Sequence, residues 1–302
     1  MNKRLGILLA IVGGICWGAS GVAGQCLLQM GDITSHWLVP VRLTMSGVIL
    51  IIYEAVMRGG KVFDIWKNRR DTFDMLVYAL LGIMLCQYTY FYTIEYSNAG
   101  TATILQYVAP VLIMAVTCVM QKRFPYLSEI ICIIFALLGV FVIATHGRLD
   151  GLAISPRALA VGLLSALTVV IYNIQPMRLM RKYSAVYLLA WALIIGGVVI
   201  SLIFKPWESM PMLNVQRILL VSVTVVAGSI MGFSLYLTGA SMIGAASASV
   251  IASVEPVTAA VMSVLFLGSP FTLFDFIGFA LIISTLVILA LSKDKTKAEV
   301  SK

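Results

Sequence analysis

Ten long apolar stretches make up most of this 302-residue chain and leave it few ways to fold. Each is about as long as the roughly 20 residues that a helix needs to cross a bilayer. They run over roughly Leu5–Leu28, His36–Met57, Phe73–Ile94, Gly100–Met120, Ser128–Thr145, Ala158–Leu179, Tyr187–Phe204, Ile218–Thr238, Ala245–Leu267 and Thr272–Leu291. We therefore predict an all-α membrane protein with ten transmembrane helices that lie in the lipid bilayer.

The composition supports this prediction. Hydrophobic residues make up 61% of the chain and charged residues only 11%, whereas a soluble domain averages about 25% charged residues. A soluble globule could not cover so much apolar surface with so few charges. Ten spans leave only short loops, so the sequence excludes an attached ATPase, kinase or DNA-binding domain.

The basic residues gather at one side of the predicted spans. With the N-terminus inside, sixteen of the 21 Lys and Arg residues fall in inside segments and four in outside segments. The inside residues are Lys3, Arg4, Arg58, Lys61, Lys67, Arg69, Arg70, Lys122, Arg123, Arg178, Arg181, Lys182, Lys293, Lys295, Lys297 and Lys302. This bias favours an even number of spans with both termini in the cytoplasm. The net charge of +8 is therefore interpreted as membrane orientation, and no nucleic-acid partner is expected.

Metal and cofactor signals are missing from the sequence. The five cysteines all fall within apolar stretches, and the chain has no C-x-x-C and only two histidines. Buried apolar thiols are the simpler interpretation. Nucleotide-binding and hydrolase motifs are also missing. We expect no metal and no cofactor. Any power to concentrate a substrate is expected to come from the gradient of an ion, a proton or a counter-substrate.

A weak internal repeat appears at an offset of 146 residues, which places Pro110 over Pro256 and Glu129 over Asp275. The order of elements agrees in both halves, so we predict five-helix repeats over residues 1–150 and 151–292 and a basic cytoplasmic tail over 293–302. Because five is odd, the second repeat enters the membrane from the opposite side. Such inverted repeats are common in transporters, with the substrate site near the midplane.

Two ionisable side chains fall at membrane depth, where charge is costly and marks a candidate functional site. Glu255 directly precedes Pro256 in the ninth stretch, and Arg42 lies in the second. Substrate binding is one interpretation for each. A structural hydrogen bond at the proline is the alternative for Glu255, and an ion pair at the outer interface is the alternative for Arg42.

Aromatic and amide side chains complete the candidate substrate site. Tyr88, Tyr92 and Glu95 share one helix face, where two phenol rings beside a carboxylate could hold a cation, or could form part of the aromatic belt at the headgroups. Trp17 lies too deep for a belt residue. The full set of candidate substrate-binding residues is Trp17, Arg42, Gln87, Tyr88, Tyr92, Gln106, Tyr172, Asn173 and Glu255.

Pro110 and Pro256 lie inside the fourth and ninth stretches. Each removes a backbone donor, so a helix kink is expected at both. A static kink and a moving hinge are both compatible with the sequence.

Several segments resemble the drug/metabolite transporter superfamily, in particular its ten-span EamA-type members. The resemblance rests on Cys16-Trp17-Gly18-Ala19-Ser20, on Ala99-Gly100-Thr101-Ala102 running to Ala109-Pro110-Val111, and on Ala245-Ala246 running to Glu255-Pro256-Val257. It implies a ten-helix inverted repeat with a central cavity for small metabolites, often amino acids and frequently exported. The chain departs from the family where an L-G-E-like ending is common, because it has Gln121-Lys122-Arg123 and Leu267-Gly268-Ser269 there.

The sequence thus predicts a secondary transporter in the cytoplasmic membrane that moves a small polar or amphiphilic substrate, such as an amino acid, by alternating access, with export as the expected direction. It leaves the oligomeric state open. The alternative is an intramembrane enzyme that acts on lipid or on another small molecule, which would need a catalytic pair at membrane depth.

Overall fold

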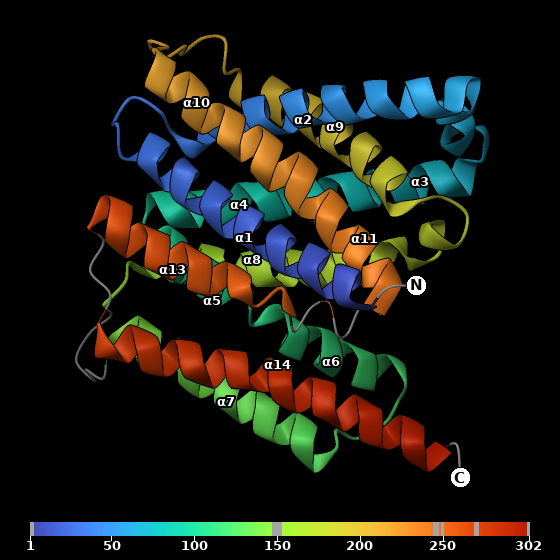
Figure 1. The fold of residues 1–302 in the computed structure, drawn as a ribbon, viewed down its shortest axis with the longest axis vertical. Coiled ribbons are helices and arrows are strands. Elements are labelled where there is room, and N and C mark those ends of the chain that lie inside the picture. Colours follow the sequence, from blue (N-terminus) through green and yellow to red (C-terminus); the bar gives the residue numbers. More distant parts are fainter. Residues whose placement is uncertain (1–2, 147–152, 244–247, 249–250, 269–271, 301–302) are drawn as a thin grey trace.

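The computed structural model describes residues 3–146, 153–243, 248, 251–268 and 272–300. Within these residues the chain consists of helices and loops, with no strand (Figure 1). This is the expected outcome for an apolar chain in lipid, because a helix satisfies all its backbone hydrogen bonds within one segment.

The helices divide into two series. The first comprises α1 (Lys3–Leu28), α2 (Ser35–Arg58), η1 (Gly59–Lys67), α3 (Arg69–Val77), η2 (Tyr78–Met84), α4 (Leu85–Glu95), α5 (Ala99–Gln106), α6 (Ala109–Met120) and α7 (Leu127–Thr145). The second comprises α8 (Pro156–Ile174), η3 (Gln175–Met177), η4 (Leu179–Arg181), α9 (Ala185–Phe204), α10 (Val215–Val223), η5 (Thr224–Gly232), α11 (Phe233–Ile243), α13 (Val254–Leu267) and α14 (Leu273–Val300).

Many element boundaries recur at the offset of 146 residues that the sequence indicates. The matched boundaries are Leu28 and Ile174, Arg58 and Phe204, Arg69 and Val215, Tyr78 and Thr224, and Leu127 and Leu273. Both η2 and η5 are π-helical, and each continues α3 or α10 into the next helix without a break. The two halves therefore share an unusual local backbone at the same place.

Side-chain caps explain two of these repeated helix starts. Asn68 and its counterpart Asn214 accept backbone N–H bonds in the first turns of α3 and α10, as N-cap residues do. At the starts of α7 and α14, Glu129 accepts from the N–H of Tyr126, and Asp275 accepts from the N–H of Thr272, each at 2.8 Å. The alignment of Glu129 with Asp275 thus corresponds to the same capping contact in both halves.

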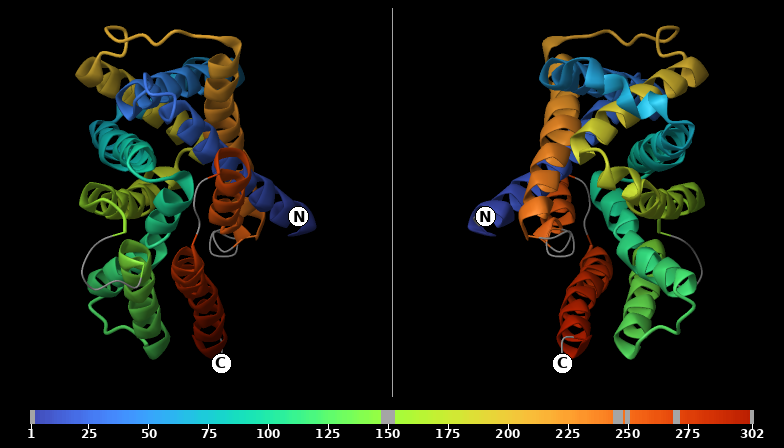
Figure 2. Two further views of the ribbon diagram at one scale, coloured as in Figure 1. Left: turned by 90° about the vertical axis from the view of Figure 1, so that its left-hand side faces the viewer. Right: turned by 90° about the vertical axis from the view of Figure 1, so that its right-hand side faces the viewer.

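The packing between the halves is reciprocal. Helix α1 packs on η5, α11 and α13 of the second series, and α8 packs on η2, α4, α5 and α6 of the first. The counterparts α2 and α9 pack on each other, and so do α7 and α14. The α2–α9 pair lies at one end of the molecule and the α7–α14 pair at the other (Figures 1 and 2). A two-fold relation between two repeats produces this exchange of partners.

Eight helices in the described part of the chain are long and apolar enough to cross a membrane, and two shorter apolar helices cover Val254–Leu267 and Leu273–Thr285. The ninth predicted stretch begins at residue 245, and residues 244–247 and 249–250 lie outside the described residues. The first eight predicted stretches agree with the eight long helices to within a few residues at most ends, and the count of ten stays a prediction.

Both prolines lie where a span is interrupted. The span Ala99–Met120 breaks at Tyr107 and Val108, so Pro110 falls in the first turn of α6. Pro256 falls in the first turn of α13, after a turn at Ala252 and Ser253. A first-turn proline costs little because that N–H has no partner within the helix. Both prolines therefore lie in the first turn of a new helix that follows a break in the span.

Candidate functional site

A small cavity of about 70 Å³ lies between the two series of helices. That volume has room for a few water molecules. Its lining residues come from α1, α2, η2, α4, α5, α8, α11 and α13, and they are Trp17, Ser20, Arg42, Ile83, Cys86, Gln87, Tyr90, Gln106, Tyr172, Phe233 and Glu255. Both halves therefore contribute to one cavity wall.

Arg42 is the cation of this cavity. Its side chain is 3% exposed, and its Nε donates to Ser229 Oγ of η5 at 3.0 Å. The guanidinium lies over the ring of Phe91, 4.6 Å from the centroid, which stabilises the cation. Within the described chain, Arg42 Nη1 is buried without a hydrogen-bond partner. A buried unpaired donor of this kind is costly, so it marks a position where a ligand acceptor would be stabilised.

Glu255 is the anion of the cavity and is 8% exposed. Tyr107 donates its hydroxyl to Glu255 Oε2 at 3.1 Å and to the carbonyl of Ala252 at 2.9 Å. Tyr107 lies at the break between α5 and α6, and Ala252 lies at the break before α13. A carboxylate can accept several further hydrogen bonds, so one tyrosine donor does not saturate it.

Arg42 and Glu255 do not neutralise each other directly. Both line the same cavity, yet none of the ion pairs within 4.0 Å in the described residues joins them. A ligand that carries both a negative and a positive group could therefore contact both side chains at once.

The neutral polar groups around the cavity are mostly paired already. Gln106 Nε2 donates to Ser165 Oγ at 2.7 Å, and Tyr90 and Thr103 share a hydrogen bond of 2.8 Å between their hydroxyls. Trp17 is different, because its Nε1 is buried without a partner among the described residues. Its ring packs edge-on against Phe233 at 4.9 Å.

Two glycines in the π-helices fit the cavity wall closely, and they are counterparts at the repeat offset. A Cβ on Gly82 of η2 would come 2.9 Å from Tyr172 Cβ. A Cβ on Gly228 of η5 would overlap Ser20 Oγ and come 2.7 Å from Arg42 Nη2. In both π-helices, the missing side chain of a glycine therefore leaves space for a cavity-lining residue of the opposite series.

Six of the nine candidate residues line the cavity, namely Trp17, Arg42, Gln87, Gln106, Tyr172 and Glu255. Their roles in binding stay predictions. The other three do not line it. Tyr88 and Tyr92 lie on a different face of the helix that presents Ile83, Cys86, Gln87 and Tyr90, because those four follow the helical spacing of three and four residues. Asn173 donates back to the carbonyl of Val169 in its own helix at 2.8 Å.

Tyr88 and Tyr92 form a separate aromatic cluster with His36, Phe204 and Tyr96. Tyr88 shares a hydrogen bond of 3.0 Å with His36 Nε2 and stacks on Phe204 at 5.1 Å. Tyr92 contacts Tyr96 at 4.7 Å. Glu95 accepts from the N–H of Ser35 at the start of α2 at 2.9 Å. The carboxylate that the sequence groups with these tyrosines thus caps a neighbouring helix.

Sequence reasoning did not select Tyr107, Ser229 or Tyr90 for the site. Tyr90 could have been found, because it continues the spacing of Cys86 and Gln87 by three and four residues. Ser229 gives no such signal, since a serine in an apolar span is equally typical of packing. Its contact with Arg42 depends on how α2 and η5 meet.

The fold and the cavity define a multi-pass helical membrane protein with two similar repeats around a central polar site. The chain belongs to the EamA-like transporter family, whose model matches residues 4–145 and 156–291. The match covers both repeats and confirms the resemblance to the drug/metabolite transporter superfamily.

Two curated proteins are similar over nearly the whole chain. An uncharacterized inner membrane transporter of Salmonella typhimurium, YicL, is 34% identical over 96% of this chain and 96% of its own. An uncharacterized transporter of Bacillus subtilis, YetK, is 24% identical over 99% of this chain and 91% of its own. A solved crystal structure has the same fold, with a TM-score of 0.65, 15% identity and coverage of 98% of this chain and 99% of the other.

Proposed function

We propose that this member of the family is a secondary transporter of small dipolar metabolites, such as amino acids, and that it exports them across the cytoplasmic membrane. The observation that carries the substrate class is the unpaired Nη1 of buried Arg42, in the same cavity as Glu255. Arg42 would bind a carboxylate, for which its planar group is suited. Glu255 would bind an ammonium group.

Alternating access is the proposed mechanism. The reciprocal packing of two similar repeats around the cavity supports it, because two related halves can adopt two related states that open to opposite sides. In this proposal the ten spans form an inverted repeat, and both termini lie in the cytoplasm with the basic loops.

Flux into proteoliposomes tests this function. We expect uptake of a labelled amino acid, weak uptake of its methyl ester, which lacks the negative charge, and weak uptake of its N-acetyl derivative, which lacks the positive charge. Empty vesicles are the control. No flux of any of the three under proton, sodium or counter-substrate gradients would contradict the proposal.

The same assay separates a transporter from an intramembrane enzyme. A transporter delivers the compound unaltered into the vesicle lumen, whereas an enzyme yields a modified product. Chromatography of the lumen contents after uptake gives the answer.

A further inference from the structure

Two ion pairs join the repeats at opposite ends of the molecule. At one end, Arg178 Nη2 lies 2.6 Å from Asp71 Oδ1. At the other end, Arg217 Nη1 and Nη2 donate to Asp32 Oδ2 and Oδ1 at 2.7 and 2.8 Å. Helix α2 begins shortly after Asp32 and ends shortly before Asp71, so its 24 residues separate the pairs by about 36 Å along the helix.

The two ion pairs are counterparts with reversed charges. The offset of 146 residues places Asp71 on Arg217, and the same offset places Asp32 on Arg178. In each pair one partner comes from the first repeat and one from the second. At both ends, an aspartate of the first repeat is therefore paired with an arginine of the second.

Local structure holds these side chains in equivalent places. Asn68 caps α3 and accepts from the N–H of Asp71 at 3.2 Å, and Asn214 caps α10 and accepts from the N–H of Arg217 at 2.9 Å. Asp71 and Arg217 are therefore the third residues of their helices. Their partners, Arg178 and Asp32, each follow the end of α8 or α1 by four residues.

Each pair connects two spans that line the central cavity. The pair Asp71–Arg178 links the span that begins with α3 to α8, which carries Tyr172. The pair Asp32–Arg217 links α1, which carries Trp17, to the span that begins with α10. Separating the linked spans at either end would open the cavity toward that end.

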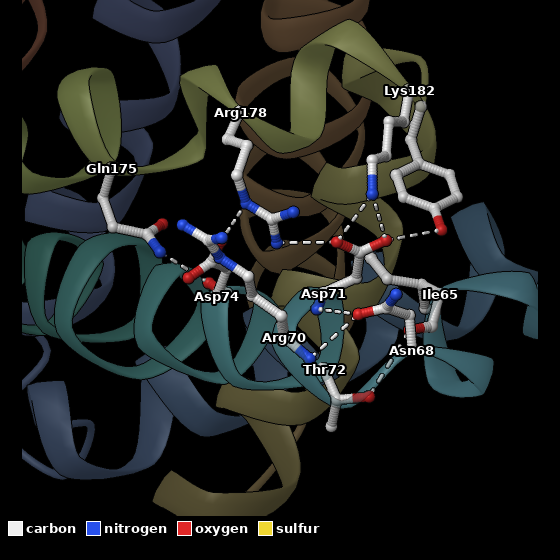
Figure 3. Close-up of polar contacts among 10 residues, drawn as sticks. Ile65, Asn68, Arg70, Asp71, Thr72, Asp74, Gln175, Arg178 and Lys182 are labelled. Carbon is white, nitrogen blue, oxygen red and sulfur yellow. Dashed lines mark hydrogen bonds and ion pairs between the residues drawn. The ribbon is translucent and has the colours of Figure 1, made fainter.

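The two pairs differ in strength. The Asp71 carboxylate is 2% exposed and also contacts Lys182 Nζ at 3.0 Å, while Arg178 Nε binds Asp74 at 2.6 Å (Figure 3). The hydrogen bonds with Asp74 and Asp71 raise the pKa of Arg178 above its usual range. The Asp32 carboxylate is 44% exposed, with Arg217 as its partner. Breaking a buried cluster costs more than breaking an exposed pair.

We propose that these ion pairs are a matched set of latches that hold the cavity-lining spans of the two repeats together at the two ends of the molecule, and that one breaks in each access state. This inference rests on the proposed alternating access. Because the latch at Asp32 is the more exposed, the resting protein opens more readily at that end than at the end with Asp71.

Cys86 provides a reporter in the cavity itself. In a chain whose other four cysteines are changed to alanine, a membrane-impermeant methanethiosulfonate reagent is added to either side of oriented proteoliposomes, without substrate. We expect Asp32→Asn to raise the rate of Cys86 modification at least about fivefold from the Asp32 side. We expect Arg178→Gln to raise it from the opposite side by a smaller factor, because Lys182 Nζ still contacts Asp71 at 3.0 Å.

Two further variants control this experiment. The double exchange Asp32→Arg with Arg217→Asp restores the attraction and should restore the original rate. Lys67→Gln removes an exposed ion pair with Asp64 within a single loop helix and should change neither rate. Asp32, Arg217 and Arg178 are all at least partly exposed, so folded protein is expected in every case.

Unchanged modification rates from both sides in Asp32→Asn and Arg178→Gln would overturn the latch proposal. The readout needs no substrate, so it is independent of the transport assay. If the rate of Cys86 modification changes in these variants but no substrate flux is found, the transport proposal is contradicted and the latches are supported. If flux is normal but the modification rates are unchanged, only the latch proposal is contradicted.

Discussion

The hydroxyl of Tyr107 donates a hydrogen bond of 3.1 Å to the carboxylate of Glu255, and this contact joins the helix break of one repeat to that of the other. Tyr107→Phe removes the donor from Glu255 Oε2, whereas the carbonyl of Ala252 keeps its bond from the N–H of Glu255 at 2.9 Å. Leaving a buried acceptor unpaired costs about 1–3 kcal/mol. We expect a lower midpoint of thermal unfolding in detergent, whereas Tyr53→Phe on the exposed surface of α2 should leave the midpoint unchanged. Equal midpoints in both variants would contradict this account of the contact.

Glu255→Gln separates the charge of this side chain from its shape. The amide oxygen can still accept from Tyr107, so the fold should persist. Loss of the charge should lower uptake of a dipolar substrate at least about tenfold, which corresponds to about 1.4 kcal/mol. Initial uptake rates measured across a range of pH provide the test. If the rate and its pH profile match those of the unaltered protein, Glu255 binds neither the substrate nor a coupling proton.

Arg42 is expected to act through both its charge and its planar geometry. Arg42→Gln should abolish measurable uptake, and Arg42→Lys should reduce it at least about tenfold, because lysine cannot hold Ser229 and a carboxylate in the same plane. Arg181→Gln, at an exposed position in the turn after α8, is the matched control. Full activity of Arg42→Lys would indicate that charge alone is sufficient at this position.

Gly228 is expected to tolerate no side chain. A Cβ added at this position would overlap Ser20 Oγ and lie 2.7 Å from Arg42 Nη2. Gly228→Ala should therefore displace the guanidinium and reduce substrate affinity at least about fivefold. Gly60→Ala is the matched control, since nothing lies within 4 Å of its Cβ position. Substrate-dependent thermal stabilisation measures the affinity, because a ligand stabilises the state to which it binds. Similar stabilisation of both variants would show that the π-helix does not position Arg42.

The all-helical fold and its repeat were predictable from the sequence because lipid allows few alternatives. Apolar runs of sufficient length define the helices, and the offset read from Pro110 and Pro256 recurs in the boundaries of most elements. The π-helices were not predictable, since neither Tyr78–Met84 nor Thr224–Gly232 has a composition unlike its neighbours. They depend on the packing that Gly82 and Gly228 permit.

The site was partly predictable because lipid also restricts which side chains occur at membrane depth. Arg42 and Glu255 could be selected because charge at membrane depth is rare, and the structure brings both to one cavity. Tyr88 and Tyr92 were selected for their chemistry and depth, but the face of a helix that meets the cavity depends on its neighbours. The latch residues Asp32 and Arg217 were not selected at all, because surface charges carry no sign of their partner in the sequence.

Trans-stimulation tests alternating access between the two repeats most directly. Proteoliposomes are loaded with an unlabelled amino acid that the flux assay identifies as a substrate, and uptake of the labelled compound is compared with that of empty-lumen vesicles. We expect faster labelled uptake into the loaded vesicles because the carrier returns loaded rather than empty, and we expect no such difference in Arg42→Gln. Equal uptake with and without the internal substrate, at a measurable rate, would contradict alternating access.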